Sequence, residues 1–286
     1  MQTVSELDAL RAAMAGLRRD GASIALVPTM GALHQGHLAL VREAKQACDH
    51  VVASIFVNPT QFGANEDLDA YPRQLAEDSA MLEAEGVSLL WAPDVKAMYP
   101  EGFGTEVAVS KLTENFCGAS RPGHFDGVAT VVCKLFNQVM PDQAFFGEKD
   151  FQQLTVIRAM ARDLDLSRPH ASAIVGVPTV REPDGLAMSS RNRYLSPSDR
   201  ERAATLPRAM REAIARIEEG ADVTRALAAL EDDLLSAGFD EVDYAELVDA
   251  RTLEQLAALT SAPARLLVAA RIGGTRLIDN MKVGAG

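Results

Sequence analysis

The fold is decided by residues 27–37, VPTMGALHQGH. The apolar residues 24–27 lead into this stretch like a short buried strand, and helical spacing of apolar residues begins at Leu38. The stretch is therefore predicted to be a strand-to-helix turn with His34 and His37 at the helix N-terminus. Free backbone N–H groups and the positive end of the helix dipole meet there, and both favour phosphate. The turn therefore predicts ATP chemistry.

Strands and helices alternate in the N-terminal part of the sequence. Strands are predicted at residues 24–27, 51–57, 87–91, 144–146 and 174–177, with helices at 38–48, 72–85, 128–139 and 151–164. Several of the strands are continuous apolar runs, as expected for a parallel sheet covered on both faces. This pattern predicts a doubly wound, Rossmann-like α/β fold that binds ligands beyond the C-terminal ends of its strands. Before the first strand, residues 3–6 (TVSE) have capping-box spacing and predict a helix that ends at Gly21.

The composition changes after Arg193 to helices rich in Ala, Arg and Glu. Helices are predicted at residues 197–217 and 224–237, followed by strands at 242–248, 266–270 and 277–283. These elements predict a smaller C-terminal α+β domain, and the turn-rich residues 178–193 are the predicted hinge. We therefore expect a domain over residues 1–179 that binds ATP and its acid substrate, and a lid domain over residues 180–286.

Composition narrows the class of protein. The 286 residues are 48% hydrophobic and 24% charged, which is typical of a globular protein with a sizeable core. A net charge of −12 argues against the broad basic face that nucleic-acid binding needs. No apolar run approaches the length of a membrane span, and the N-terminus lacks a basic segment followed by an apolar one. We therefore expect a cytoplasmic protein with neither a membrane nor a nucleic-acid partner.

Two polar segments follow predicted strands. After the strand at 51–57, Asn58 and Gln61 could present amide donors at the edge of the sheet, although Asn-Pro is also a common turn signal and leaves a structural role open for Asn58. After the strand at 144–146, Lys149 would place a point charge near polyphosphate. Asp150 could cap the next helix or bind a ribose hydroxyl, and Gln153 lies one turn further on.

A third polar segment, residues 184–192 (DGLAMSSRN), lies in the predicted hinge. The hydroxyls of Ser189 and Ser190 can hold the β- and γ-phosphates of ATP, while the Arg191 guanidinium neutralises developing charge. The three cysteines, Cys48, Cys117 and Cys133, are widely spaced and have the pattern of neither a disulfide framework nor a metal site.

A family resemblance is carried by six motifs, in order PTMGALHxGH, SIFVNPxQF, AYPR, RPGHFDGV, FFGEKDFQQL and GLAMSSRNRYL. They resemble the pantothenate synthetases (pantoate–β-alanine ligases), a family of the HxGH nucleotidyltransferase-like α/β superfamily. The resemblance covers essentially the whole chain, is most specific between residues 24 and 195, and fades after that. It implies that ATP drives the condensation of (R)-pantoate with β-alanine through a pantoyl adenylate, giving pantothenate, AMP and diphosphate. It also implies a homodimer.

The resemblance also implies roles for individual residues. The implied ATP-binding set is Met30, Gly31, Ala32, Leu33, His34, Gln35, Gly36, His37, Gly147, Glu148, Lys149, Asp150, Val180, Met188, Ser189, Ser190 and Arg191. The catalytic subset is His34, His37, Lys149, Ser189, Ser190 and Arg191, with His37 either transferring a proton or only hydrogen-bonding phosphate. The implied pantoate set is Gln61, Gln153, Asn58, Arg121 and His124, with Gln61 also near β-alanine.

No cluster of His, Cys and carboxylate side chains has the spacing of a dedicated metal site, so Mg²⁺ is expected only as the ATP chelate. Glu77 and Asp78 could assist it, but acidic residues on an exposed helix usually face solvent. Pro72, next to the family-like Tyr71 and Arg73, suits the first position of a helix.

Two other functions remain open from the sequence. A related HxGH adenylyltransferase would move AMP onto a phosphorylated acceptor, but its acceptor site would need more arginine or lysine where Gln61 and Gln153 offer neutral amides. A silent nucleotide sensor or a tRNA-binding relative is the second alternative. The complete set of histidine, lysine and serine–arginine elements argues against the sensor, and the acidic composition argues against tRNA.

Overall fold

The computed structural model describes residues 1–63, 68 and 71–284. The chain forms two compact units: Met1–Glu148 with Gln153–Pro178, and Lys149–Gln152 with Thr179–Gly286. The sequence predicted domains over residues 1–179 and 180–286, whereas in the structure Lys149–Gln152 and Thr179 also belong to the second unit. The roles predicted for the two domains stay predictions. Ala70, the first residue of the AYPR motif, lies outside the described residues.

The first unit contains a six-stranded parallel sheet in the order β1-β4-β3-β2-β5-β6. Its strands are β1 (Gln2–Val4), β2 (Ile24–Thr29), β3 (His50–Ile55), β4 (Leu89–Trp91), β5 (Gln143–Gly147) and β6 (Ile174–Val177). The chain runs from β2 through β3 to β4 on one side and then returns to β5 and β6 on the other. Neighbouring strands β2 and β5 therefore form the topological switch point, where doubly wound sheets bind their ligands. The predicted doubly wound fold is confirmed.

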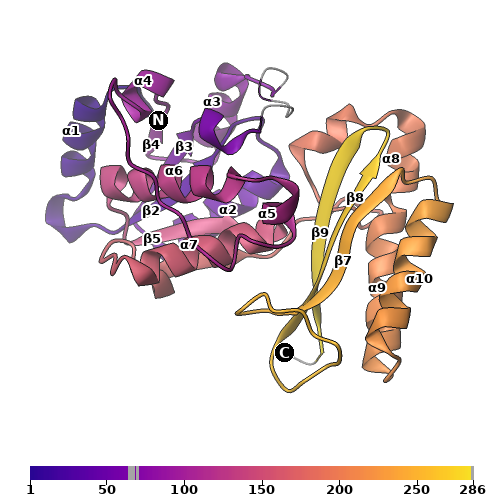
Figure 1. Ribbon diagram of the computed structural model, residues 1–286. Coiled ribbons are helices and arrows are strands. Elements are labelled where there is room, and N and C mark those ends of the chain that lie inside the picture. The colour runs from indigo at the N-terminus through magenta and orange to yellow at the C-terminus, as the bar shows by residue number, and fades with distance from the viewer. Residues whose placement is uncertain (64–67, 69–70, 285–286) are drawn as a thin grey trace. The chain divides into compact units, whose positions relative to one another are not determined.

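Helices cover both faces of this sheet (Figure 1). They are α1 (Leu7–Leu17), α2 (Gln35–Ala47), α3 (Leu75–Ala84), α4 (Val95–Met98), α5 (Cys117–Ser120), α6 (His124–Val139) and α7 (Phe151–Asp163), with short 3-10 turns at η1 (Arg19–Gly21), η2 (Pro59–Gln61), η3 (Glu148–Asp150) and η4 (Ala171–Ala173). Leu40 and Val41 of α2 and Leu82 of α3 pack on the strands from one side. Residues 24–27 of β2 are fully buried, as their continuous apolar run predicts.

Three predictions about local structure are wrong. Residues 3–6 form no capping box, because Gln2–Val4 is an edge strand paired with Leu89–Trp91 of β4, and Glu6 takes the N-cap position without a side-chain hydrogen bond. The first helix ends at Leu17, and the left-handed Asp20 breaks the helical path before Gly21. Helix α3 begins at Leu75, so Pro72 is not its first residue.

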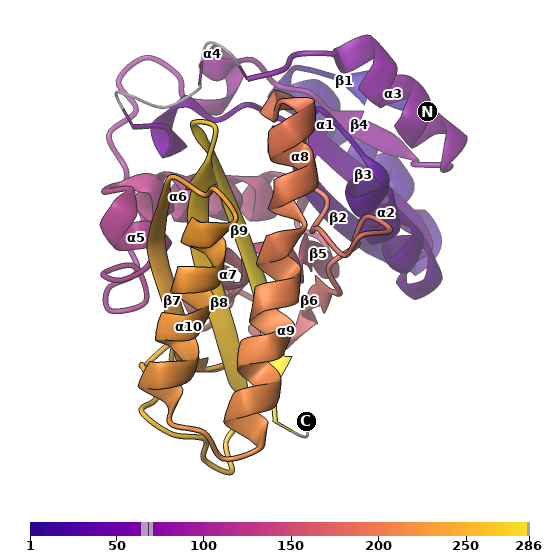
Figure 2. The same cartoon turned by 90° about the vertical axis from the view of Figure 1, so that its right-hand side faces the viewer.

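The second unit packs two long helices against a three-stranded antiparallel sheet, β7-β8-β9 (Figure 2). Its strands are β7 (Glu241–Asp249), β8 (Ala264–Ile272) and β9 (Thr275–Val283), and its helices are α8 (Pro197–Ala203), α9 (Thr205–Glu218) and α10 (Val223–Ser236), preceded by the 3-10 turn η5 (Ser190–Tyr194). The predicted helix over 197–217 is therefore interrupted at Ala204. The α+β architecture is confirmed.

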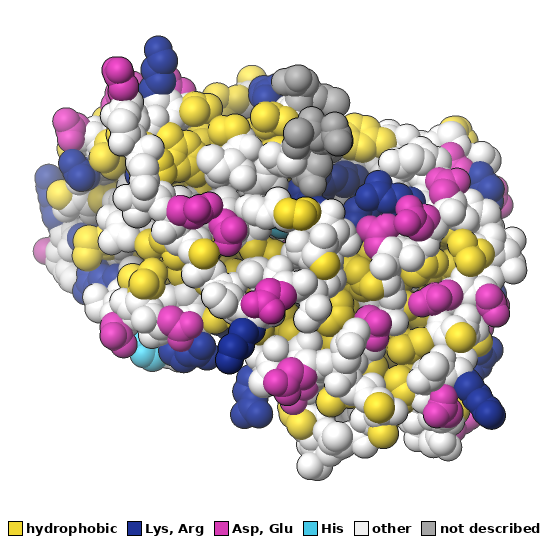
Figure 3. Space-filling model, viewed as in Figure 1, with side chains coloured by type: hydrophobic (Ala, Val, Ile, Leu, Met, Phe, Trp, Pro, Cys, Tyr) yellow, Lys and Arg dark blue, Asp and Glu magenta, His cyan; other side chains and the backbone are white. Residues whose placement is uncertain are grey.

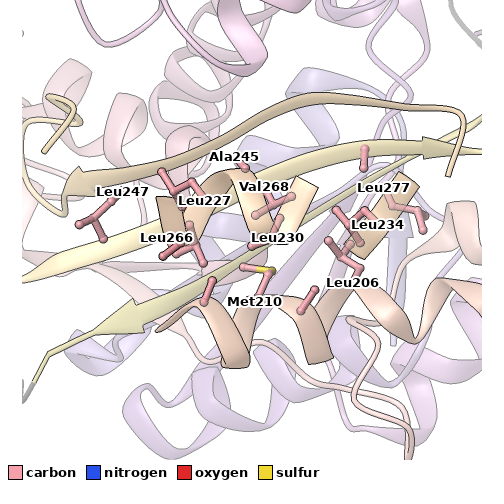
Figure 4. Packing of buried hydrophobic residues seen from close by; sticks show 14 of the residues in the cluster. Leu206, Met210, Leu227, Leu230, Leu234, Ala245, Leu247, Leu266, Val268 and Leu277 are labelled. Carbon is pink, nitrogen blue, oxygen red and sulfur yellow. The ribbon is translucent and has the colours of Figure 1, made fainter. Parts of the chain in front are cut away.

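The core of the second unit lies between its helices and one face of its sheet (Figure 4). Leu206 and Met210 of α9 and Leu230 of α10 contact the same cluster as Leu266 and Val268 of β8. Because alternate residues of a strand share a face, the even-numbered residues of β8 pack on the helices. The odd-numbered residues of β8 therefore point to the other face of the sheet.

Candidate active site

The HxGH turn joins the end of β2 to the start of α2. His34 is the N-cap of α2, and its Nδ1 accepts a hydrogen bond from the Gly36 N–H at 3.1 Å. His37 Nδ1 accepts one from the His34 N–H at 3.3 Å, so each histidine satisfies a backbone donor of the helix start. The ring centroids lie 4.1 Å apart. Because both Nδ1 atoms are acceptors, a neutral ring at either position carries its proton on Nε2.

A buried carboxylate in α3 holds the loop before these histidines. Asp78 is 1% exposed, and its oxygens accept hydrogen bonds from the Ala32 N–H at 2.8 Å and the Leu33 N–H at 2.9 Å. Gln74 Nε2 donates to the same carboxylate at 3.2 Å. Gly31 has φ +83°, and a Cβ there would lie 2.9 Å from Asp78 Oδ2, so this turn requires glycine.

The prediction that Asp78 faces solvent or helps hold magnesium is therefore wrong, because its carboxylate is buried and accepts hydrogen bonds from backbone N–H groups. Its neighbour Glu77 is exposed, as expected for an acidic residue on a helix surface. Nothing in the local sequence distinguishes these two carboxylates. The only available signal is the helical register of α3, which turns Asp78 and Leu82 to the same side.

Gln61 lies directly beside the HxGH loop. The residue is 7% exposed, and its Nε2 donates to Met30 Sδ at 2.9 Å. Asn58 is 1% exposed, and its Nδ2 donates to Gln61 Oε1 at 3.2 Å and to Gly127 O at 3.1 Å. Asn58 Oδ1 accepts the Tyr99 hydroxyl at 2.8 Å. Asn58 thus joins the Gln61 side chain to Gly127 and Tyr99 through hydrogen bonds, and its role in binding pantoate stays a prediction.

Arg121, directly after α5, and His124, the first residue of α6, both contact Gln61. His124 Nδ1 donates to the Gln61 carbonyl at 2.7 Å, and Arg121 Nη2 donates to it at 3.3 Å. Arg121 Nη1 donates to His124 Nε2 at 2.9 Å, so the imidazole keeps its proton on Nδ1. Gly127 lets α6 approach this closely, because a Cβ there would lie 2.5 Å from the Thr60 carbonyl oxygen. The sequence could not place Arg121 and His124, and it gave no role to Gly127.

The segment after β5 is divided between the units. Gly147 ends β5, and Glu148 and the half-buried Gln153 also belong to the first unit. Lys149 and Asp150 belong to the second unit, and their Nζ and Oδ1 atoms lie 3.6 Å apart. The Lys149 side chain is 19% exposed.

The serine–arginine segment follows a short hairpin in the second unit. Arg181 and Ala187 form an antiparallel bridge, and the Met188 N–H donates to the Val180 carbonyl at 3.0 Å. Ser189 is the N-cap of η5, and its Oγ accepts from the Arg191 N–H at 3.3 Å. Ser190 and Arg191 follow in η5 and are half-buried. The segment predicted as a hinge therefore has regular hydrogen bonds of its own.

Residues 1–63, 68 and 71–284 contain no group of three or more His, Cys, Asp or Glu side chains able to hold a metal ion. Burial raises the pKa of the Cys48 and Cys133 thiols, which keeps both protonated at neutral pH and weakens them as nucleophiles. On the face drawn in Figure 3, acidic and basic side chains are interspersed. Within the same described ranges, no helix has the length and apolar character needed to cross a membrane.

Comparison with known proteins places these observations in a family context. A family model described as pantoate-beta-alanine ligase matches residues 2–282. The chain is 66% identical over 284 residues to a pantothenate synthetase from Novosphingobium aromaticivorans, covering 99% of each chain. It is 51% identical to the pantothenate synthetase from Thermus thermophilus, whose crystal structure matches with a TM-score of 0.93 over 100% of both chains.

A second solved structure is more distant in sequence. The pantoate-beta-alanine ligase from Francisella tularensis, complexed with "Beta-gamma ATP and Beta-alanine", is 33% identical and matches with a TM-score of 0.83. The match covers 100% of this chain and 99% of that one. The similarity thus includes the segment after residue 195, where the recognised motifs end.

Proposed function

Because the chain belongs to the pantoate–β-alanine ligase family, we propose that it condenses (R)-pantoate with β-alanine to give pantothenate, a precursor of coenzyme A, while ATP is split to AMP and diphosphate. A carboxylate is a poor acyl donor and must first be activated. A carboxylate oxygen of pantoate attacks the α-phosphorus of ATP, and the bond from that phosphorus to the bridging oxygen breaks as diphosphate leaves. The amine of β-alanine then attacks the acyl carbon of pantoyl adenylate, loses a proton and displaces AMP.

The capped histidine pair carries this proposal. Neutral His34 and His37 present Nε2–H donors at the N-terminus of α2, where the helix dipole also favours negative charge. Such donors stabilise the charge that builds up on the phosphoryl oxygens in the transition state. An imidazolium has no acceptor, so a doubly protonated His37 would lose its hydrogen bond from the His34 N–H. The geometry therefore supports His37 as a hydrogen-bond donor to phosphate rather than as a proton donor.

Neutral amides recognise the pantoate. Gln61 and Gln153 hold its hydroxyls or carboxylate, and Gln61 also lies near β-alanine. Asn58, Arg121 and His124 support this pocket through the Gln61 side chain and carbonyl. Amide groups suit the hydroxyls and the single carboxylate of pantoate better than a phosphorylated acceptor, which would need more cationic partners.

The remaining nucleotide contacts come from two segments of the second unit. Lys149 and Arg191 offset the charge of the polyphosphate, while Ser189 and Ser190 donate hydrogen bonds to it. Asp150, Val180 and Met188 complete the ATP-binding set with residues 30–37, 147 and 148, and the C-terminal domain acts as the lid. Mg²⁺ enters as the ATP chelate. The family resemblance further supports a homodimer, and the sequence composition supports a cytoplasmic location.

Isotope exchange between diphosphate and ATP tests the first half-reaction. The purified protein with ATP, Mg²⁺ and labelled diphosphate should form labelled ATP when pantoate is present and β-alanine is absent, because adenylation does not need the amine. Omitting pantoate, or replacing it with a phosphorylated acceptor, is the matched control. Net synthesis without exchange would exclude a freely reversible adenylation, and exchange that depends on the phosphorylated acceptor would show the related adenylyltransferase instead.

A further inference from the structure

Two neighbouring residues in the middle of β9 are polar and almost completely buried. Asp279 is 3% exposed and Asn280 is 4% exposed. Successive residues of a strand point to opposite faces of the sheet. Asp279 pairs with Val268, which packs against the helices, so its side chain points to the helix-covered face, and Asn280 points to the opposite face. Neither residue belongs to a motif recognised in the sequence.

Asp279 anchors the hairpin that leads into the serine–arginine segment. Arg181 donates two hydrogen bonds to its carboxylate, from Nη1 to Oδ2 at 2.6 Å and from Nη2 to Oδ1 at 2.9 Å. The same guanidinium donates to the carbonyls of Gly185 at 3.0 Å and Asn280 at 3.3 Å. Because Arg181 bridges to Ala187 across the hairpin, this clamp fixes the point from which residues 188–191 continue.

On the other face of the sheet, Asn280 anchors the turn that contains Lys149. Its Nδ2 donates to the Lys149 carbonyl at 2.8 Å. Its Oδ1 accepts a hydrogen bond from Arg265 Nη1, and the Arg265 guanidinium lies 3.9 Å from the centre of the Phe151 ring. Both ends of the Asn280 amide are therefore used, and the backbone of Lys149 is held while its side chain stays 19% exposed.

We propose that Asp279 and Asn280 are positioning residues that set the two phosphate-binding segments of the second unit relative to each other. This inference rests on the proposed adenylation function. Asp279 acts through Arg181 on residues 188–191, and Asn280 acts through the Lys149 carbonyl. Charge stabilisation in a transition state needs donors held in place before the reaction, and a displacement of about 1 Å costs about 100-fold in rate. A buried ion pair is itself weak evidence for stability, because apolar residues can often replace it at no cost.

The chain contains a matched control for the Asp279–Arg181 pair. Asp243 on β7 is another carboxylate of the same sheet, with a side chain that is 8% exposed. It accepts hydrogen bonds from Arg276 Nε at 2.5 Å and Arg271 Nε at 3.3 Å. Neither of these hydrogen bonds leads to the Lys149 turn or to residues 188–191. Asp243→Asn should therefore lower stability without altering the positions of those segments.

The test compares three isosteric variants, Asp279→Asn, Asn280→Asp and Asp243→Asn. Pantoate-dependent ATP–diphosphate exchange should fall about 10- to 100-fold in the maximal rate for the first two, with the KM for pantoate unchanged. Asp243→Asn should keep the wild-type exchange rate, even if its Tm falls as far as the Tm values of Asp279→Asn and Asn280→Asp. Amide formation from supplied pantoyl adenylate should stay near wild type in all three, because that step needs no polyphosphate contacts. If Asp279→Asn and Asn280→Asp lose no more exchange than Asp243→Asn, the two residues are only structural and the proposal is wrong.

If Asp279→Asn does not fold, Arg181→Lys replaces it in the test, because lysine keeps the charge but loses the bidentate hydrogen bond to Asp279. An unchanged exchange rate in a folded Arg181→Lys would also overturn the proposal. If the wild type shows neither pantoate-dependent exchange nor net synthesis of pantothenate, the proposed function fails. The positioning role is then decided by the Kd of a non-hydrolysable ATP analogue, which should rise in Asp279→Asn and Asn280→Asp but not in Asp243→Asn.

Discussion

The two regions expected to bind phosphate are held in place in different ways. In the HxGH turn, the hydrogen bonds that cap the helix join residues two and three positions apart, His34 with Gly36 and with His37. In the second unit, the Lys149 carbonyl is held by a residue 131 positions away, and Arg181 is held by one 98 positions away. The hydrogen bonds that cap the helix are made by residues of the HxGH motif itself. The hydrogen bonds to Lys149 and Arg181 depend on a strand near the end of the chain.

This difference shows where motif recognition ends. Helix capping depends on residue type and spacing, so HxGH can be interpreted locally. The role of a buried polar pair such as Asp279 and Asn280 depends on the hydrogen-bond partners that lie next to it in the folded chain. The chain after residue 195 therefore lacks recognisable motifs, yet its residues touch both segments of its unit that we propose to bind phosphate.

The largest expected effect comes from removing one charged or polar group from each region. His37→Ala and Lys149→Ala should each lower the adenylation rate by about two to four powers of ten, or about 3 to 5 kcal/mol, because each removes a proposed donor to the phosphates in the transition state. Exchange of diphosphate into ATP measures this rate. Circular dichroism should show both variants folded.

Supplying pantoyl adenylate sharpens the comparison between the two residues. Amide formation from this intermediate no longer involves diphosphate, so Lys149→Ala should retain far more of the second half-reaction than of the first. Equal damage to both half-reactions would assign Lys149 a structural or acyl-transfer role. The polyphosphate site would then have to be sought elsewhere.

An intermediate effect is expected at Asp78, a residue distant in sequence whose carboxylate accepts hydrogen bonds from the HxGH loop. Asp78→Asn leaves one of the N–H groups of Ala32 and Leu33 facing an amide donor instead of an oxygen acceptor. The free energy of unfolding should fall by about 1 to 3 kcal/mol, and the exchange rate should fall about tenfold as the loop shifts.

Glu77→Gln is the matched control for Asp78, because it changes the net charge equally at an exposed neighbour in the same helix. Its unfolding free energy should stay within about 0.5 kcal/mol of the wild type. Urea denaturation measures the unfolding free energy of both variants, and ATP–diphosphate exchange assays measure their adenylation rates. If the two variants behave alike, the buried carboxylate does not hold the HxGH loop.

Much of the fold could be predicted from the sequence because its signals are local. The strand at residues 174–177 lies where its apolar run predicts, and His34 and His37 lie at the start of a helix. The edge strand Gln2–Val4 could not be predicted, because three residues carry little periodicity and this strand forms only by pairing with β4. The burial of Asp78 and the contacts of Arg121 with Gln61 depend on tertiary packing, which spacing along the chain does not encode.

The smallest effect is expected at a surface contact of the second unit's hairpin, where Asp184 Oδ2 accepts a hydrogen bond from Arg200 Nη1 at 2.6 Å. This contact and the Leu186 N–H hold the pKa of Asp184 below its usual value of 3.8. A lowered folded-state pKa adds stability above the unfolded-state pKa, and that stability is lost as the pH falls through the folded-state pKa. Since both side chains are about one-third exposed, Asp184→Asn should cost less than about 1 kcal/mol at pH 7. Urea denaturation of the wild type and the variant should show this difference shrinking as the pH falls below 3.8. A difference that is larger than this and independent of pH would show that the hairpin needs Asp184 for its shape, and that local contacts hold it as firmly as Asp279 does.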